Sequence, residues 1–123
     1  MATTIAFAGE LAEDPRVRFT PDGEALTSFR VVVSEAAGPG EGASTIHHYC
    51  QAWGDTAENV AESFSRGDRV TIQGEVRAGT WAADDGESRP VQVVHVAEIG
   101  ASVRWATVRV RRLPQGGADG SGG

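Results

Sequence analysis

One stretch decides the fold class: residues 55–77, with the sequence DTAENVAESFSRGDRVTIQGEVR. Its first half predicts a helix, because apolar residues recur at helical spacing at Ala57, Val60, Ala61 and Phe64. Asp55 and Glu58 predict an N-cap with its capping-box partner, and Arg66-Gly67 predicts the helix end. The second half alternates apolar and polar residues, which predicts a strand over Arg69–Arg77 with Val70, Ile72, Gly74 and Val76 facing inward.

Shorter segments on both sides of this stretch also have strand patterns. Those before it are Thr4–Leu11, Arg16–Thr20, Ala25–Ser34 and Thr45–Trp53. After it, a hairpin tip at Asp84-Asp85-Gly86 leads to Pro90–Ile99, where Gly100 ends the strand, and Val103–Val110 forms a last strand. Three strands, a helix and two strands predict an all-β protein with one short helix. We expect a five-stranded OB-fold barrel with long hairpins and an extra C-terminal strand.

The segment Thr45–Trp53 has two different faces. One face carries Ile46, His48, Cys50 and Ala52, and the other carries His47, Tyr49, Gln51 and Trp53. Two aromatic rings and an imidazole are unusual on a strand face bound for solvent. The second face is therefore a candidate binding surface.

Length and charge limit the alternatives. The 123 residues are enough for one domain, which we place at 1–112, followed by a disordered glycine-rich tail at 113–123. A glycine-rich loop is expected at 36–44. All 11 basic residues are arginine, and the net charge of −6 argues against coating nucleic acid through bulk charge. The charge is uneven, however, since 103–112 holds four arginines and no acid.

The single cysteine indicates a reducing compartment, and neither a signal peptide nor a membrane-spanning run is visible. We expect a cytoplasmic, nucleoid-associated protein. Cys50 is expected to be a buried small hydrophobe, with an intersubunit disulfide as the alternative if a two-fold axis passes close to its strand.

The sequence gives little support for catalysis or metal binding. His47, His48, Cys50 and His95 could suggest zinc, but alternation places His47 opposite His48 and Cys50, and no paired ligand spacing completes a tetrahedral set. The sequence has no nucleophile elbow, no phosphate-binding glycine loop and no carboxylate pair at a spacing suited to catalysis, since Asp84-Asp85 is explained by the hairpin tip. No enzyme activity, metal or cofactor is expected.

Several motifs together resemble the bacterial single-stranded DNA-binding protein family, in its actinobacterial, tail-less form. They are Gly9-Glu10-Leu11 with Asp14-Pro15-Arg16-Val17-Arg18-Phe19, Trp53-Gly54 with residues 56–63, Arg66-Gly67-Asp68-Arg69-Val70 with Gly74 and Trp81, and residues 98–107. The resemblance implies a homotetramer of OB barrels that wraps single-stranded DNA without sequence preference. In the actinobacterial branch an extra strand clamps subunits together, which implies interface roles for Val103 and Trp105.

The resemblance also assigns residues to the DNA path. Trp53, Trp81 and His47 stand at stacking positions, Arg18, Arg66 and Arg77 at basic positions, and His48 at a subunit contact. Two positions depart from the family pattern: Ala37 replaces a fourth stacking residue, and Asp55 replaces a common lysine. These departures predict weaker binding per subunit. The tail at 115–123 has one acid and no terminal hydrophobe, so tail-mediated protein recruitment is not expected.

The residues support the same interpretation on chemical grounds. Binding any base needs aromatic faces, and binding the backbone needs fixed cations. Trp81 sits among small and polar residues, a poor core position, and Tyr49 shares the face of Trp53. We expect non-enzymatic, sequence-independent protection of single-stranded DNA in replication, recombination, repair or segregation. The alternatives are an OB-fold protein-interaction scaffold with little nucleic-acid binding, and RNA as the main ligand.

Overall fold

The computed structural model describes residues 2–35, 42 and 44–114 as six strands and one helix. The elements are β1 (Thr3–Leu11), β2 (Arg16–Phe19), β3 (Ala25–Glu35), β4 (Ser44–Trp53), α1 (Gly54–Ser63), β5 (Arg69–Ala82) and β6 (Ser88–Ala101). The all-β prediction is confirmed, although β5 and β6 are longer than expected. Most of the predicted 36–44 loop, with Ala37, and most of the tail lie outside the described residues. Within the described ranges no helix is long and apolar enough to cross a membrane.

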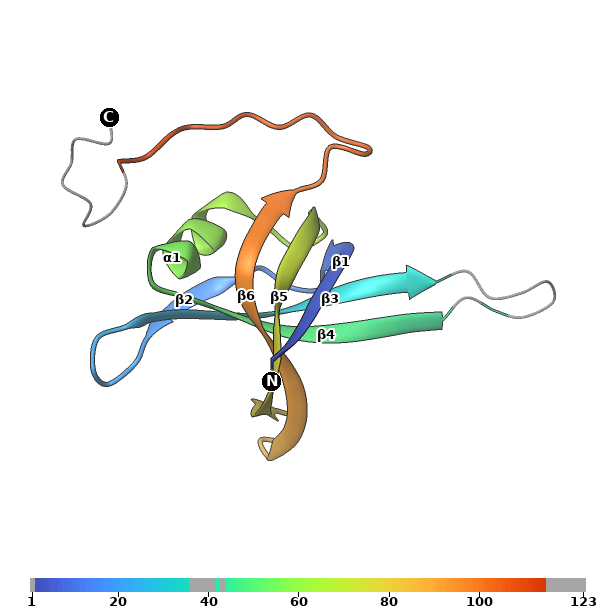
Figure 1. The fold of residues 1–123 in the computed structure, drawn as a ribbon. Helices are drawn as coiled ribbons and strands as arrows, with labels where there is room; N and C mark the ends of the chain where they lie inside the picture. The colour runs from blue at the N-terminus through green and yellow to red at the C-terminus, as the bar shows by residue number, and fades with distance from the viewer. Residues whose placement is uncertain (1, 36–41, 43, 115–123) are drawn as a thin grey trace.

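Hydrogen-bonded strands close into a ring. The order is β1-β5-β6-β4-β3-β2, and β1 also pairs with β3 through Glu10↔Val32 and Leu11↔Val31. Five strands therefore form the ring, and β2 extends the outer edge of β3. The parallel pairing of β4 with β6 at Tyr49–Gln51 completes the circuit. This arrangement is that of an OB fold, and two long hairpins, β3–β4 and β5–β6, project from it in different directions (Figure 1).

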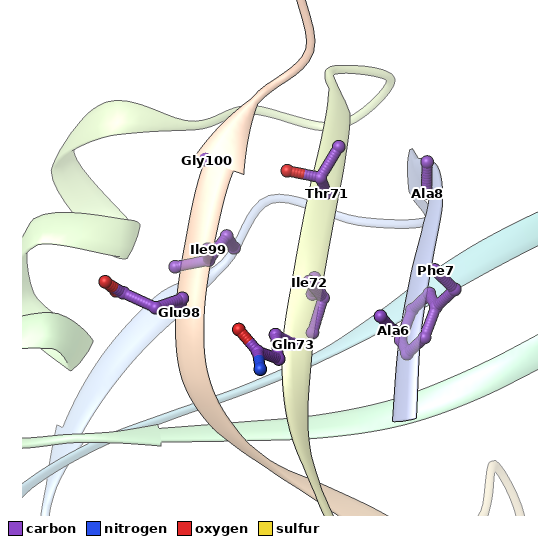
Figure 2. A pocket seen from close by; sticks show the side chains of 9 residues that line it. All are labelled: Ala6, Phe7, Ala8, Thr71, Ile72, Gln73, Glu98, Ile99 and Gly100. Carbon is purple, nitrogen blue, oxygen red and sulfur yellow. The ribbon is translucent and has the colours of Figure 1, made fainter. Parts of the chain in front are cut away.

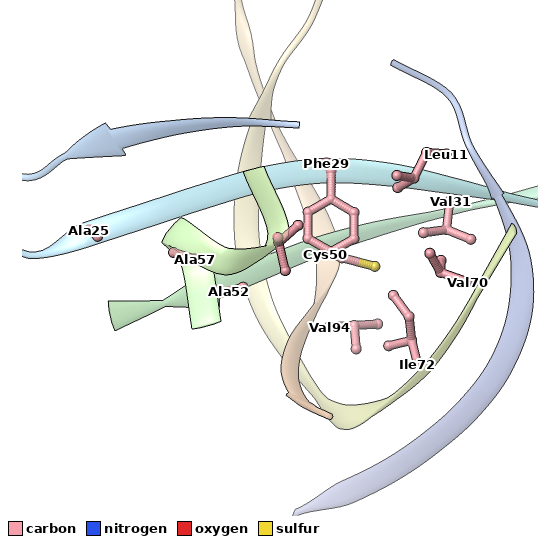
Figure 3. Close-up of a cluster of buried hydrophobic side chains, with 11 residues drawn as sticks. Leu11, Ala25, Phe29, Val31, Cys50, Ala52, Ala57, Val70, Ile72 and Val94 are labelled. Carbon is pink, nitrogen blue, oxygen red and sulfur yellow. The ribbon is translucent and has the colours of Figure 1, made fainter. Parts of the chain in front are cut away.

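The core lies inside this ring. Its largest fully buried side chains include Phe29, Val31, Val60 and Val70, and Figure 3 shows most of the cluster. Helix α1 covers one end, where the predicted stripe residues Ala57 and Val60 are buried. The buried Thr27 hydroxyl donates a hydrogen bond of 2.8 Å to the Ala57 carbonyl oxygen, so the helix is fixed to β3 without an unsatisfied polar group.

The predicted helix start is wrong by two residues, since the N-cap is Trp53 rather than Asp55. The helix begins at Gly54 after an extended Trp53, and no side chain caps it. Gly54 has a φ of +64°, a left-handed conformation that turns the chain directly from β4 into α1. Asp55 consequently lies in the first turn rather than at the cap, where its carboxylate still faces the positive end of the helix dipole.

The helix end also differs from the prediction. α1 stops at Ser63, and the next residue, Phe64, is extended so that its ring packs against the core. Arg66 is therefore outside the last helical turn. Asp68 closes the following loop by accepting a hydrogen bond of 2.8 Å from the Ser65 N–H. Gly67 adopts the expected positive φ, at +90°.

Two glycines in the long strands have different consequences. Gly74 marks a β-bulge, and a Cβ there would press on the His95 carbonyl oxygen, so the close approach of β5 and β6 requires glycine. The prediction that Gly100 ends the strand is wrong. Gly100 pairs with Thr71 and β6 continues to Ala101, because ladder hydrogen bonds override a weak local preference.

The predicted extra strand at Val103–Val110 is not formed within the described residues. The Ser102 N–H donates the last ladder-like hydrogen bond, 2.9 Å long, to the Arg69 carbonyl oxygen. Beyond it the chain runs as an irregular segment past α1 (Figure 1). Val103 and Val110 are 70% and 84% exposed. A strand needs a neighbouring edge for its backbone groups, and this segment pairs with none of the described strands.

Candidate nucleic-acid interface

The outer face of β4 carries an aromatic pair at its centre. Tyr49 meets Trp81 of β5, with ring centroids 4.8 Å apart and ring planes tilted by 54°. Both side chains are half-buried. Gly79, two residues before Trp81 on β5, leaves room for the Val93 side chain of β6, since a Cβ there would lie 2.7 Å from Val93 Cγ2. Two predicted platform residues, distant in sequence, thus form one aromatic surface.

A second ring pair lies further along the same face. Trp53 ends β4 and is half-buried, with its ring centroid 6.3 Å from that of His95 on β6. The register aligns Gln51 with His95, so these side chains share a side of the sheet. The sequence pointed to His95 only as a possible metal ligand. The parallel pairing of β4 and β6, which alternation cannot reveal, places it beside Trp53.

The predicted His47 does not join either pair. It is exposed on β4, aligned with Val32 towards the outer part of the β3–β4 hairpin. Its place on the same alternating face as Tyr49 and Trp53 is as expected, but no ring of the described residues stacks on it.

A groove of about 640 Å³ borders the Tyr49–Trp81 pair. Its walls come from the β1–β2 turn, strands β2, β3 and β4, the loop after α1 and the end of β5. Its lining includes Arg16, Arg18, Arg66, Gln51, Thr80 and Trp81. Two of the three predicted arginines, Arg18 and Arg66, therefore lie in one groove with Trp81. Arg16, Gln51 and Thr80 are additional residues that the sequence pattern did not single out.

The loop carrying Arg66 is tied to this groove through its backbone. The Arg66 N–H donates a hydrogen bond of 2.7 Å to Asp14 Oδ1, across 52 residues of sequence. Asp14 thus holds the loop after α1 against the β1–β2 turn. The aspartate that matched a family motif in the sequence has a structural role here, and it leaves the Arg66 guanidinium exposed.

Arg77 lies outside this groove. The register aligns Arg77 with Val93, and Val93 with Tyr49, so Arg77 shares the outer face with the aromatic pair. Its guanidinium Nη2 is 2.8 Å from Glu75 Oε1, and the two side chains are 58% and 41% exposed. An ion pair this exposed is weak, so Glu75 holds the Arg77 guanidinium only loosely.

The predicted interface residues fall elsewhere. His48 stacks on Phe7 of β1, with centroids 4.0 Å apart and planes at 21°, and partial burial lowers the pKa of its imidazole. Trp105, predicted as interface or core, is not in the core of this chain. It is 71% exposed, and the guanidinium carbons of Arg69 and Arg104 lie 4.9 and 4.5 Å from its ring centre.

A shallow face lies elsewhere on the outer surface of the ring, over β1, β5 and β6. Figure 2 shows β1, β5 and β6 side by side with the side chains that line a hollow there. The volume of this hollow is about 650 Å³. The residues aligned across these strands are Ala6–Gln73–Glu98 and Ala8–Thr71–Gly100. Because most of them are small and only Glu98 is charged, the surface is flat and weakly charged. Within the described residues, the second edge of β1 is unpaired from Thr3 to Gly9.

Cys50 points into the barrel rather than toward this surface. It is fully buried, and burial raises the pKa of its thiol to about 12. The expectation of a buried small hydrophobe is confirmed. An intersubunit disulfide would require the barrel to open at its centre.

Comparison with known proteins gives a consistent answer. The model of the "Single-strand binding protein family" matches residues 2–102. The "Single-stranded DNA-binding protein" of Mycobacterium tuberculosis is 38% identical over 125 residues, covering 98% of this chain and 76% of that protein. The protein of the same name from Mycolicibacterium smegmatis is 38% identical over 120 residues, covering 94% and 73%. The resemblance inferred from the sequence is confirmed: this chain belongs to the single-strand binding protein family.

Proposed function

We propose that this protein binds and protects single-stranded DNA without sequence preference, as a homotetramer. Bases stack on the Tyr49–Trp81 surface and on Trp53, while Arg18, Arg66 and Arg77 neutralise phosphates. One observation carries the proposal: a half-buried aromatic pair on the outer face borders a groove lined by arginines that are not paired with acids in the described structure. The names of the relatives, all single-stranded DNA-binding proteins, support DNA as the ligand.

The chemistry explains the lack of sequence preference. Every base has a π-face, and stacking on an aromatic side chain is worth about 1–3 kcal/mol per base. The backbone is held by charge, which is the same at every nucleotide. Duplex DNA hides its base faces inside the helix, so it is expected to bind weakly to a protein with a net charge of −6.

Homotetramer formation rests on separate features. The low face of β1, β5 and β6 and the unpaired edge of β1 suit a second copy of the chain. His48 lies against Phe7, which also lines that hollow, and Val103 and Trp105 are exposed apolar residues beyond it. Four barrels on one strand would raise the affinity through effective concentration, which offsets the missing fourth stacking residue and the acidic Asp55. Replication, recombination, repair and segregation are the processes that expose such a strand.

The test is a titration with oligo-dT while tryptophan fluorescence is followed. Strong quenching is expected, and a Trp53→Ala/Trp81→Ala variant should lose most of it. Trp105→Phe is the matched control, since it removes a tryptophan outside both ring pairs, keeps an aromatic ring at the proposed subunit contact and should leave the quenching in place. Absence of binding to a 35-mer at low salt would refute the proposal. Sedimentation of the same sample reports whether four chains act together.

A protein-interaction scaffold is the second candidate. The net charge of −6 and the pairing of Arg30, Arg69 and Arg77 with carboxylates favour it. The same titration separates the two, because a scaffold would leave tryptophan fluorescence unchanged. Competition between oligo-dT and oligo-U tests RNA, since stacking tolerates either sugar.

A further inference from the structure

The groove beside Trp81 contains a cation that neither the family motifs nor the sequence pattern assigned to the DNA path. Arg16 and Arg18 are alternate residues of β2, so both side chains leave the same side of the strand. Arg16 lines the groove together with Arg18, Arg66 and Trp81. Three arginines from two separate segments therefore line one hollow.

We propose that Arg16 binds a backbone phosphate, so that β2 holds two consecutive phosphates of the strand whose base stacks at Trp81. Residues i and i+2 of a strand are about 6.5 Å apart, a spacing close to one nucleotide step of an extended single strand. Arg16 and Arg18 thus match two neighbouring phosphates, and Arg66 lines the same groove. This inference rests on the proposed function.

The acids of the groove do not compete for Arg16. Glu13 is held by Arg30, whose Nη2, Nε and backbone N–H lie 2.7, 3.1 and 3.1 Å from its carboxylate oxygens. Asp14 accepts the Arg66 N–H at 2.7 Å. Among the described residues, no carboxylate is within salt-bridge distance of the Arg16, Arg18 or Arg66 guanidinium groups.

Arg16 has no evident structural task. Its side chain is exposed, and β2 is fixed through the backbone, where Arg16 pairs with Ser28 and Phe19 with Ala25. Truncation at Cβ should therefore leave the thermal unfolding midpoint unchanged. An exposed, unpaired guanidinium at the rim of an aromatic groove is what backbone binding needs.

The test is the salt dependence of oligo-dT binding by Arg16→Ala. Leaving one phosphate without its cation should reduce the slope of log K against log salt by about 0.7, which weakens binding about fivefold at 0.1 M salt. Arg16→Lys should keep the slope, because one charge still meets the phosphate. Arg112→Ala is the matched control: it removes the same charge from the C-terminal segment, outside this groove, and should keep the wild-type slope.

The outcomes separate this inference from the proposed function. If wild type binds and Trp81→Ala weakens binding, but Arg16→Ala keeps the slope of Arg112→Ala, then the role of Arg16 is refuted and the proposed function stands. If wild type does not bind oligo-dT, both fail. A smaller slope for Arg16→Ala alone, restored by Arg16→Lys, supports the inference.

Discussion

The two faces of β4 differ sharply although they share one backbone. Cys50 and Ala52 point inward and are fully buried, whereas Tyr49, Gln51 and Trp53 point outward and stay half-buried. The inner residues are held by packing, which tolerates only small changes in volume. The outer residues contribute little to the stability of the fold, but the fold determines their positions. The barrel therefore holds the candidate binding face in place. Substitutions on the inner face should lower stability, whereas substitutions on the outer face should lower oligo-dT affinity.

Phe29→Ala breaks the inner face and should have the largest effect. Phe29 is fully buried and aligned with Cys50 in the register of β3 and β4. Removing its ring leaves a cavity, which should lower the free energy of unfolding by about 3–5 kcal/mol. Chemical denaturation measures the loss, and oligo-dT affinity of the still-folded fraction should stay close to wild type.

The comparison is sharpened by measuring both quantities on the same sample. If Phe29→Ala altered the affinity of folded molecules as strongly as their stability, the two faces of the barrel would not be separable. Phe29→Leu serves as the milder control, since it keeps most of the apolar volume and should lose less stability.

Tyr49→Ala is the matching change on the outer face. Its ring supports Trp81 at 4.8 Å, so its removal should weaken oligo-dT binding by about 1–3 kcal/mol and leave unfolding nearly unchanged. Tyr49→Phe keeps the ring and should bind like wild type. Fluorescence titration and denaturation together check this. A loss of stability without a loss of affinity in Tyr49→Ala would show that Tyr49 serves packing instead.

Cys50→Ser tests how apolar the inner face is. The change places a hydroxyl in the core, and we expect a loss of about 1 kcal/mol in unfolding free energy, because the His48 carbonyl that the thiol approaches at 3.7 Å can accept its hydrogen bond. With its pKa raised to about 12, the thiol of the folded protein should not react with a disulfide reagent near neutral pH. Fast reaction without denaturant would contradict this burial.

Alternation along the strands predicted most of the fold and both faces of β4. It worked because one side of each strand is buried, which is the condition that produces a period of two. It failed where an element depends on something outside its own residues. Val103–Val110 alternates like a strand but pairs with none of the described strands. The predicted capping box at Asp55 is replaced by the left-handed turn at Gly54.

The candidate site was predicted unevenly for the same reason. Trp53, Trp81 and Tyr49 stand out by residue type, and the structure places them on one face. Arg16 and His95 became candidates only through tertiary pairing, since their neighbours come from distant segments. The sequence did contain one indication for Arg16: it lies two residues before Arg18 on a short strand, so the two side chains share a face. The net charge of −6 could not reveal a local groove of arginines.

The smallest expected effect is on the pH dependence of stability and comes from His48, which is on the same face of β4 as Cys50 but is only partly buried. Partial burial against Phe7 lowers the pKa of its imidazole in the folded state, so below pH about 6.5 the unfolded chain takes up the proton more readily. Its contribution to stability is therefore present above that pH and is lost as the pH falls further. His48→Gln should flatten the decline in unfolding free energy between pH 7.5 and about 5.5. His47→Gln, which removes an exposed imidazole from the outer face, should keep the wild-type decline, and equal slopes in all three proteins would show that His48 does not carry it.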